Sequence, residues 1–300
     1  MKNITAKPET FRSATAQAVL DVPAFCIPLL QQRKTEKGDA LEIARMAGIL
    51  AAKKTWELLP FCHQLSLTGI DSQYAFTDTS VTVTVTVEVI AGTGVEMEAL
   101  TAASVTALTL WDMLKPHAEQ EMMIREVRLL EKRGGKSHYP ATLKTPKKAV
   151  ILAPSDAVIE GTKRATAGQA ARKALEKAGF VIASYELLPD DLNTLQNRVR
   201  DWLKDENIAL ILTVGGTGTQ ANDCAVEALT PLITKPLPGI MEAARHYGQR
   251  RTPYALVSRG VAGMNGNTIL LTCPGSTRGA NETLAAIMTG LVHVVDGLQG

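Results

Sequence analysis

The stretch VTVTVTVEVI, residues 81–90, has valine at every odd position and threonine or glutamate at the even positions through 88. An alternation with period two predicts a β-strand that has valine on one face and polar side chains on the other. We therefore expect this part of the chain to lie in a sheet.

Helices are predicted on both sides of this strand. Asp39, with Glu42 three residues on, is typical of a capped helix start. The helix is expected over 41–59, because Pro60 follows it. A second helix is expected over 96–115, ending at Pro116, and its small or apolar residues nearly all round indicate burial. With a further strand at 124–130, this half is predicted to have an α+β fold.

The composition changes at residues 133–148, RGGKSHYPATLKTPKK, where glycine, proline and lysine occur without apolar periodicity. This composition is typical of a linker. We predict a first domain over 1–138, a linker over 139–147 and a second domain over 148–300.

Beyond the linker, short apolar runs alternate with helical stretches. This alternation predicts an α/β fold with a doubly wound, largely parallel sheet. The predicted strands are AVILA (149–153), FVIASYELL (180–188), IALILTV (208–214), YALVS (254–258) and TILLTC (268–273).

The charge balance argues against nucleic acid as the main partner, because 32 basic and 30 acidic side chains leave a net charge of only +2. The four cysteines are scattered without a CxxC pair, which fits a reducing compartment. The first residues lack the apolar core of a signal peptide, and no apolar run is long enough to span a membrane. We therefore expect a cytoplasmic protein with no membrane partner and no tightly bound cofactor.

Charged side chains in the first half cluster where the apolar pattern does not require them. Asp112 is the most informative, because a carboxylate in the last turn of a helix opposes the helix dipole and Lys115 can offset it. A helix-end ion pair explains these two residues without any function, and glutamates also favour a helix start. The other residues of this set are Lys37, His63, Glu96, Glu98, Lys132 and Lys136.

These residues lie in three long segments, KGDALEIARMAGILAAKKTWELLPFCHQL (37–65), GTGVEMEALTAASVTALTLWDMLK (92–115) and VRLLEKRGGKS (127–137). In this order the segments closely resemble the cyclic pyranopterin monophosphate synthase family, and the resemblance spans residues 1–138. It implies the substrate 3′,8-cyclo-7,8-dihydro-GTP, the product cyclic pyranopterin monophosphate and release of pyrophosphate. It also implies a ferredoxin-like domain that forms a homo-hexamer, with pockets at dimer interfaces.

The resemblance assigns the catalytic role to Lys37, Asp112 and Lys115. Clustered lysines lower one another's pKa, which suits proton transfer near neutral pH, and further cations can hold the triphosphate. Gln64 and Gly92 depart from the family's usual proline and lysine. The implied substrate-binding residues are Lys7 and Arg12, from a neighbouring subunit, with Lys53, Cys62, His63, Glu96, Met97, Glu98, Lys132 and Lys136.

In the second half, the predicted strand IALILTV runs directly into GGTGT, residues 215–219. A glycine-rich turn after a buried strand exposes backbone N–H groups that can hold phosphate, and doubly wound sheets bind ligands at such strand ends. Alone, the turn is also explained as a tight strand–helix connection. Five further segments are PSD (154–156), LPDD (188–191), PGIMEAAR (238–245), SRGVAG (258–263) and CPGS (273–276).

Together with GGTGTQAND (215–223), these segments resemble the molybdopterin-binding family, which includes molybdopterin adenylyltransferases, over residues 148–297. In active members AMP passes from ATP to molybdopterin with magnesium, and the matching Mg²⁺ ligands are Asp190 and Asp223. Ala165 and Asn222 stand where an acid and an arginine are usual, so a non-catalytic pterin-binding or assembly module is the alternative. The implied site contains Ser155, Asp156, Asp190, Gly215, Gly216, Thr217, Gly218, Asp223, Glu242, Ser258, Arg259, Pro274, Gly275 and Ser276.

The two resemblances converge on molybdenum cofactor biosynthesis and predict a bifunctional enzyme, a lyase in its first half. Its partners would be the cyclised GTP derivative, molybdopterin, ATP in the adenylylating case, and further copies of itself. A nucleotide-binding protein whose lysines only hold phosphate is a third interpretation, but it leaves Asp112 and His63 unexplained.

Overall fold

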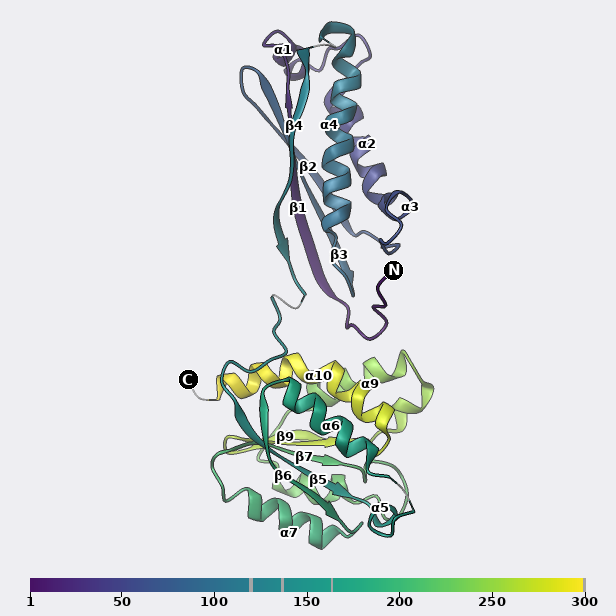
Figure 1. Cartoon of the computed structure of the whole chain (residues 1–300), viewed down its shortest axis with the longest axis vertical. Helices are drawn as coiled ribbons and strands as arrows, with labels where there is room; N and C mark the ends of the chain where they lie inside the picture. Colours follow the sequence, from purple (N-terminus) through teal and green to yellow (C-terminus); the bar gives the residue numbers. More distant parts are fainter. Residues whose placement is uncertain (119–120, 136–137, 163, 299–300) are drawn as a thin grey trace. The chain divides into compact units, whose positions relative to one another are not determined.

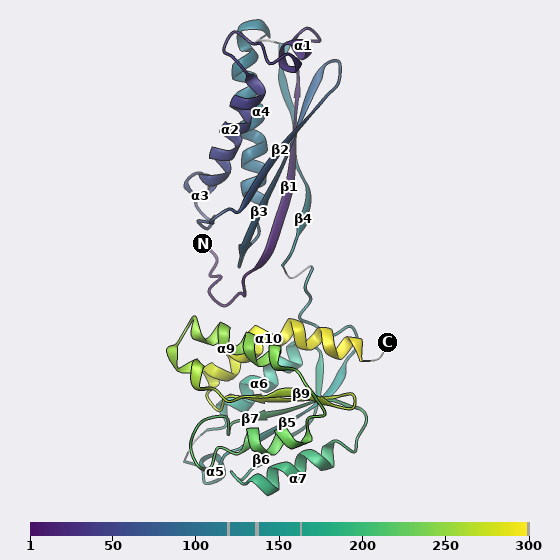
Figure 2. The same cartoon turned by 180° about the vertical axis from the view of Figure 1, so that it is seen from behind.

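A computed structural model describes residues 1–118, 121–135, 138–162 and 164–298. The chain divides into two units, Met1–His138 and Tyr139–Gly300, each with its own sheet and core (Figure 1). Figure 2 shows the same elements from behind. None of the helices in these described ranges is both long and apolar enough to cross a bilayer.

The alternating stretch lies in a strand of the first unit, as predicted. This strand, β3, pairs on both sides in an antiparallel sheet of order β2-β3-β1-β4. Along the chain the elements follow the order strand, helices, strand, strand, helix, strand. The strands are β1 (Thr10–Asp21), β2 (Gly69–Phe76), β3 (Ser80–Ala91) and β4 (Met123–Arg133).

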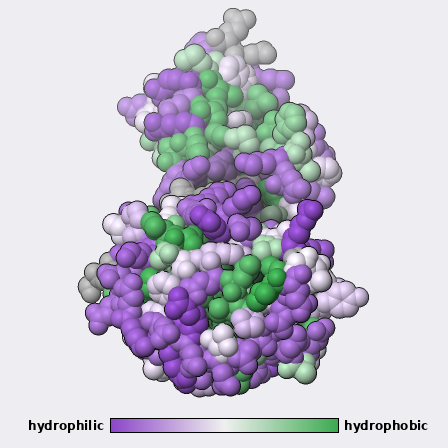
Figure 3. All heavy atoms as spheres, turned by 60° about the horizontal axis from the view of Figure 1, so that its bottom comes forward, coloured by the Kyte–Doolittle hydropathy of each residue, from purple (hydrophilic) through white to green (hydrophobic). Residues whose placement is uncertain are grey.

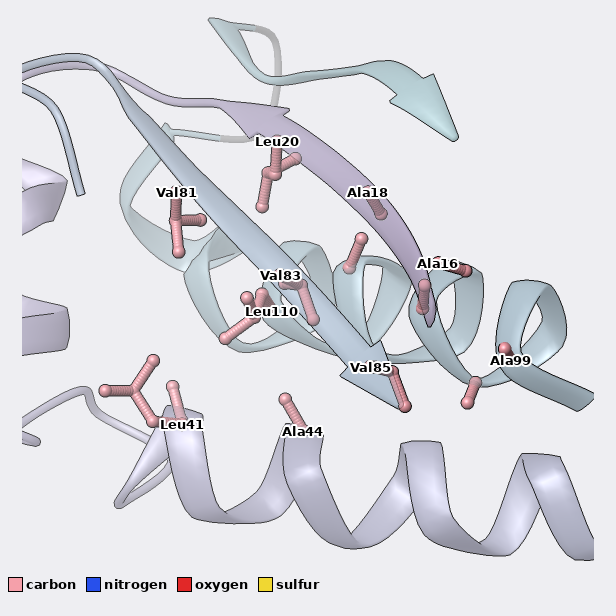
Figure 4. Close-up of a cluster of buried hydrophobic side chains, with 14 of the residues drawn as sticks. Ala16, Ala18, Leu20, Leu41, Ala44, Val81, Val83, Val85, Ala99 and Leu110 are labelled. Atoms are coloured by element: carbon pink, nitrogen blue, oxygen red, sulfur yellow. The ribbon is translucent and has the colours of Figure 1, made fainter. Parts of the chain in front are cut away.

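Two long helices cover one face of this sheet (Figure 1). The valines of β3 are buried against them, together with alanines of β1, and Figure 4 shows these small side chains between sheet and helices. The opposite face is polar, where Thr15 and Thr86 share a hydrogen bond of 2.9 Å. The helices of this unit are α1 (Cys26–Gln31), α2 (Ala40–Lys53), α3 (Thr55–Leu58) and α4 (Glu96–Ala118).

The single helix expected over 41–59 is wrong, because the chain breaks it at Lys54. Lys54 leaves helical geometry, with φ −105° and ψ 6°. The hydroxyl of Thr55 donates to the Ala51 carbonyl at 3.1 Å, and such a local bond competes with the regular helix ladder. The predicted start is confirmed, since the Asp39 carboxylate accepts from the Glu42 N–H at 3.1 Å.

The prediction that the second helix ends at Pro116 is also wrong, because α4 continues to Ala118 with Pro116 inside its last turn. A proline there removes one helical N–H, the one that would bond the carbonyl of Asp112 four residues earlier. The loss affects a single bond near the helix end, where the ladder is about to stop in any case.

The second unit has a sheet of order β6-β5-β7-β10-β9-β8. The first four strands in this order are parallel, and β9 and β8 run antiparallel at one edge, so the sheet is mostly parallel as expected. The strands are β5 (Lys147–Pro154), β6 (Phe180–Leu188), β7 (Ile208–Val214), β8 (Lys235–Pro236), β9 (Ala262–Asn265) and β10 (Thr268–Cys273).

Helices lie on both faces of this sheet (Figure 1). One core joins it to α6, α9 and α10, and another joins it to α7 and α8. The helices are α5 (Asp156–Ile159), α6 (Thr166–Lys177), α7 (Leu192–Trp202), α8 (Ala225–Leu229), η2 (Thr230–Leu232), α9 (Pro238–Gln249), η3 (Pro253–Val257) and α10 (Thr277–Gly297).

The strand expected at 254–258 is wrong, because these residues form the 3₁₀ helix η3. Pro253 at its start has no N–H for a sheet ladder, and Tyr254 is 81% exposed. Four strands were not predicted from the sequence: β1 and β2 in the first unit, and β8 and β9 in the second, the latter two being too short to show an alternation. Apolar side chains remain on the surface (Figure 3). In the first unit the exposed ones include Ile43, Met46 and Leu50 of α2.

Candidate active sites

The end of α4 gathers the three predicted catalytic residues. The Lys37 ammonium donates to the Asp112 carboxylate at 3.0 Å and to the Asp112 carbonyl oxygen at 2.7 Å. The Lys115 ammonium lies 3.2 Å from the other carboxylate oxygen. These bonds, led by the one from Lys37, lower the pKa of Asp112, so the carboxylate stays ionised between two cations. We call these three residues the helix-end cluster.

Pro116 accounts for the geometry of this cluster. Because it has no N–H, the Asp112 carbonyl lacks its usual helical donor, and the Lys37 ammonium takes that position. Lys37 reaches it from the segment just before α2, whose start is fixed by the Asp39 cap. A break in one hydrogen-bond ladder thus provides an acceptor for a lysine from another segment.

A second group surrounds the first turn of α4. Glu96 opens the helix and lies 3.5 Å from the Lys132 ammonium of β4. Glu98 is only 4% exposed, and burial raises its pKa. The pKa of the half-buried Cys62 thiol is raised mainly by its own burial and further by the charge of Glu98, so Cys62 and Glu98 are neighbours. Met97, the helix residue between the two glutamates, is 41% exposed.

The opening segment of the chain also reaches this end of α4. The ring of His63 bonds the Lys2 carbonyl at 2.9 Å. Lys7 passes close to Gly92, where an added Cβ would lie 3.6 Å from the Lys7 Cβ. Arg12 is on β1, beside Gly134 at the end of β4. The helix-start cluster comprises Lys7, Arg12, Lys53, Cys62, His63, Glu96, Met97, Glu98 and Lys132.

Lys53 belongs to this cluster because α2 and α4 run antiparallel. The start of α2 lies near Asp112, and Gly48 in its second half packs against Ala102 and Thr106. The end of α2, where Lys53 is exposed, therefore lies near the start of α4. Lys136, the remaining predicted binding residue, lies outside the described residues.

The two clusters are far apart in one chain. Glu96 and Asp112 lie at opposite ends of α4, which separates them by about 24 Å at the rise of an α-helix. No lysine side chain bridges this gap. Within one copy, the structure brings Lys37, Asp112 and Lys115 together but does not bring them to the helix-start cluster.

In the second unit, predicted site residues meet at one edge of the sheet. The parallel strands β5, β6, β7 and β10 end there, followed by the segments that begin at Ser155, Asp190, Gly215 and Pro274. Asp156 and Asp190 exchange bonds, each carboxylate accepting from the other's backbone N–H at 3.0 and 3.1 Å. A Cβ added at Gly275 would lie 3.2 Å from the Gly215 Cα, so a glycine at this position lets the two turns pack closely.

Arg259 holds the glycine loop that follows β7. Its guanidinium donates to the Gly218 carbonyl at 2.6 Å, to the Asp223 carbonyl at 3.1 Å and to Glu227 at 2.5 Å. Its backbone N–H donates to Thr217. Glu227 was not among the predicted site residues, although a carboxylate on the helix after the loop is a possible partner for an arginine.

Several predicted ligand groups in this unit are engaged in local structure. The hydroxyls of Ser155 and Ser276 cap α5 and α10, and Asp223 accepts from the Gln220 N–H at 2.8 Å. Ala165, where the family has an acid, leaves α6 without a side-chain cap. The last predicted residues are Gly216 and Thr217 in the loop, Ser258 before Arg259, and the exposed Glu242 on α9.

The metal prediction rests on oxygen ligands alone. Among the described residues, no three His, Cys, Asp or Glu side chains are placed to hold a metal ion. Burial, and then the charge of Asp190, raises the pKa of the Cys224 thiol, so Asp190 faces the residue that follows Asp223. Two carboxylates suit Mg²⁺ only if phosphate oxygens complete its shell.

The fold and the sites define a two-domain protein, with a lysine–carboxylate cluster in an α+β unit and a glycine loop in an α/β unit. Residues 1–135 match the model of the MoaC family, and residues 150–293 match that of the "Probable molybdopterin binding domain". The chain is 37% identical over 304 residues to the molybdenum cofactor biosynthesis bifunctional protein of Chlorobaculum tepidum, covering 100% of this chain and 95% of that protein. The chain belongs to this family of bifunctional proteins.

Other relatives match the whole chain or one half. The bifunctional protein of Synechococcus elongatus is 31% identical over 313 residues, covering 100% of this chain and 98% of that protein. The cyclic pyranopterin monophosphate synthase of Brevibacillus brevis is 47% identical over 138 residues, covering 46% of this chain and 86% of the synthase. The crystal structure of the molybdopterin biosynthesis enzyme MoaB from Thermus thermophilus matches with 38% identity and a TM-score of 0.47, covering 50% of this chain and 97% of that one.

Proposed function

We propose that the N-terminal unit converts 3′,8-cyclo-7,8-dihydro-GTP into cyclic pyranopterin monophosphate and pyrophosphate, as a step of molybdenum cofactor biosynthesis. The chain is an enzyme of this pathway, and its first half is a cyclic pyranopterin monophosphate synthase. The observation that carries the proposed chemistry is the helix-end cluster, in which one ionised carboxylate holds two lysine ammonium groups within 3.2 Å.

The residues of this cluster can divide the chemistry between them. The rearrangement needs several proton transfers, and the two ammonium groups are proton donors held side by side on one carboxylate. Asp112 keeps both lysines in place as a carboxylate, and its low pKa means that it does so at neutral pH. The cations of the helix-start cluster, Arg12 and Lys132, are suited to hold the phosphate chain.

A complete site then requires two copies of the chain. The helix-start and helix-end clusters are separated by about 24 Å along α4, so one copy supplies each cluster to a shared pocket. The apolar stripe of Ile43, Met46 and Leu50, each at least 40% exposed, supports association between copies. A hexamer built from such pairs, and a ferredoxin-like classification of this unit from its element order, belong to the same proposal.

Turnover of the cyclised dihydro-GTP by the full-length protein tests the function, with pyrophosphate and the cyclic pterin followed together. Lys37→Ala and Asp112→Asn should each lower kcat by about a hundredfold or more. Lys34→Ala is the matched control, since Lys34 is an exposed lysine three positions earlier, and its turnover should stay normal. Normal turnover in Lys37→Ala would reject the assigned role, and no product from the folded wild type would reject the function.

For the C-terminal unit, we propose molybdopterin binding at the strand ends that carry the glycine loop. Backbone N–H groups after β7 suit a phosphate, and Asp190 and Asp223 could hold Mg²⁺ through phosphates of bound ATP in an adenylyl transfer. The alternative is a pterin-binding or assembly module without catalysis. It is favoured by Ala165, which lacks the acid, and by the Asp223 carboxylate, which bonds its own loop.

Calorimetric titration of the full-length protein with ATP and Mg²⁺ separates these two functions. Adenylyl transfer requires ATP binding that depends on Mg²⁺ and weakens in Asp223→Asn. A module without catalysis binds molybdopterin but not ATP. A cytoplasmic location is part of the same proposal, in keeping with the four free cysteines.

A further inference from the structure

Arg12 lies near the N-terminal end of β1, and its side chain has an unusual environment. It pairs in register with Val89, and it lies on the same face of the sheet as Ala14, two residues on. Ala14 is buried in the core under α4, and its partner on β4 is Lys132, which reaches Glu96 at the first residue of α4. Arg12 is therefore on the helix-covered face, just beyond the point where α4 starts.

Two polar atoms on this face are buried without a partner. Among the described residues, the Nε–H of Arg12 and the hydroxyl oxygen of Thr10 have no hydrogen-bond partner. The two residues are separated by one position on β1, so their side chains lie on the same side. Buried donors without acceptors are rare in folded proteins, and two of them side by side indicate a missing acceptor. A guanidinium and a hydroxyl both donate to an anion.

Two consecutive glycines define the space that Arg12 occupies. Gly134 and Gly135 both have left-handed backbones, with φ of +90° and +75°. A Cβ at Gly135 would overlap Nη1 of Arg12 and lie 3.2 Å from its Cζ. A Cβ at Gly134 would lie 2.9 Å from the Arg12 Cδ and would overlap the Phe11 carbonyl oxygen. The guanidinium thus lies directly against the backbone of this turn, which only glycine permits.

We propose that Gly134 and Gly135 are positioning residues that fix the Arg12 guanidinium, and that Thr10 completes with Arg12 a subsite for a phosphate group. The proposal rests on the proposed function, in which the substrate carries a triphosphate and pyrophosphate leaves. Glu96, the carboxylate at the first residue of α4, is paired with Lys132 and does not fill the subsite. The glycines act through Arg12 and make no contact with substrate themselves.

Inorganic pyrophosphate is the probe, titrated calorimetrically into the full-length protein in the absence of substrate. Arg12→Ala should weaken its binding by roughly tenfold or more, as for a lost charge-assisted bond. Gly135→Ala should weaken binding to a similar extent, and Thr10→Val by a smaller factor. The matched control is Gly161→Ala, because Gly161 has φ of +76° but nothing within 4 Å of an added Cβ. It should leave pyrophosphate binding unchanged.

A double-mutant cycle separates positioning from general damage. In the Arg12→Ala background the Cβ of Gly135→Ala meets no guanidinium, so the second substitution should add almost nothing to the loss of binding. In turnover assays, Gly135→Ala should raise KM by a larger factor than it lowers kcat. If the losses from Arg12→Ala and Gly135→Ala multiply, or if Gly135→Ala binds pyrophosphate normally, the proposal is wrong.

A folding failure of Gly135→Ala and a failure of the proposed function can each be told apart from a failure of the subsite. If Gly135→Ala does not fold, Arg12→Lys tests the same subsite without touching the turn, since lysine keeps the charge but loses the Nε–H and the planar fork. It should weaken pyrophosphate binding, and unchanged binding would overturn the proposal. Pyrophosphate binding that follows this pattern in a protein without synthase turnover would reject the proposed function and leave the subsite in place.

Discussion

The separation of the two clusters along α4 leads to a quantitative prediction about mixed oligomers. A chain with Lys37→Ala has a defective helix-end cluster, and a chain with Arg12→Ala and Lys132→Ala lacks two cations of the helix-start cluster. Each variant alone should be nearly inactive, because every pocket in its oligomer has one defective half. If the pocket combines clusters from two copies, a hybrid pair contains one intact pocket and one with both halves defective.

The expected recovery follows from the symmetry of a pair. Random mixing of equal amounts makes half of the pairs hybrid, and each hybrid has one active pocket of two, so turnover should reach about a quarter of the wild-type value. The assay mixes the two variants through reversible denaturation, with wild type treated in the same way as the control. Each variant refolded alone gives the baseline. Mixtures no more active than this baseline would refute the shared pocket, because both clusters would then act within one copy.

Three further predictions concern packing, pH and thiol chemistry. Gly48→Ala forces a Cβ against Thr106, so it should lower the free energy of unfolding by about 1–2 kcal/mol in urea titrations, and Thr106→Ala should restore most of it. Bonds from Arg198 lower the pKa of Glu186 below 4.5, so this carboxylate stabilises the fold above that pH and ceases to do so as pH falls through the lower value. Glu186→Gln should therefore flatten the decline of stability below about pH 5. Cys62 is the one half-buried cysteine, so a thiol reagent should label one site in the folded chain and none in Cys62→Ser.

The elements that could be predicted from the sequence are those whose signals are local. The valine alternation of β3 is confirmed because a strand half covered by helices requires this pattern, and the Asp39 cap is confirmed because it depends on residues three apart. The strand predicted at 254–258 failed because Pro253 and the exposed Tyr254 exclude a ladder that composition alone suggested. Short strands such as β9 are fixed by pairing with neighbours in space, which no local pattern contains.

For the candidate sites, the sequence likewise identified residues but not the contacts that their side chains make. The family resemblance, and not the residue types, pointed to Lys37, Asp112 and Lys115 together. The prediction of one pocket did not anticipate that Glu96 lies about 24 Å from Asp112 along α4. The sequence does not reveal the state of each side chain. Arg259 was expected in the pterin or nucleotide site, and its guanidinium bonds two loop carbonyls and a glutamate. The roles of such residues depend on contacts between segments distant in the chain.

The helix-end cluster also shows how packing at one place sets chemistry at another. Lys37 meets Asp112 only because α2 runs antiparallel to α4 at close range, and Gly48 permits that approach by leaving room for Thr106 and the Ala102 carbonyl, 3.3 Å from an added Cβ. The N-cap residue Asp39, two residues after Lys37, then fixes where α2 begins. A change at Gly48 would therefore shift the lysine relative to its acceptor before it unfolds the unit. The position of the ammonium is a property of the helix pair, and residues without any chemistry of their own determine it.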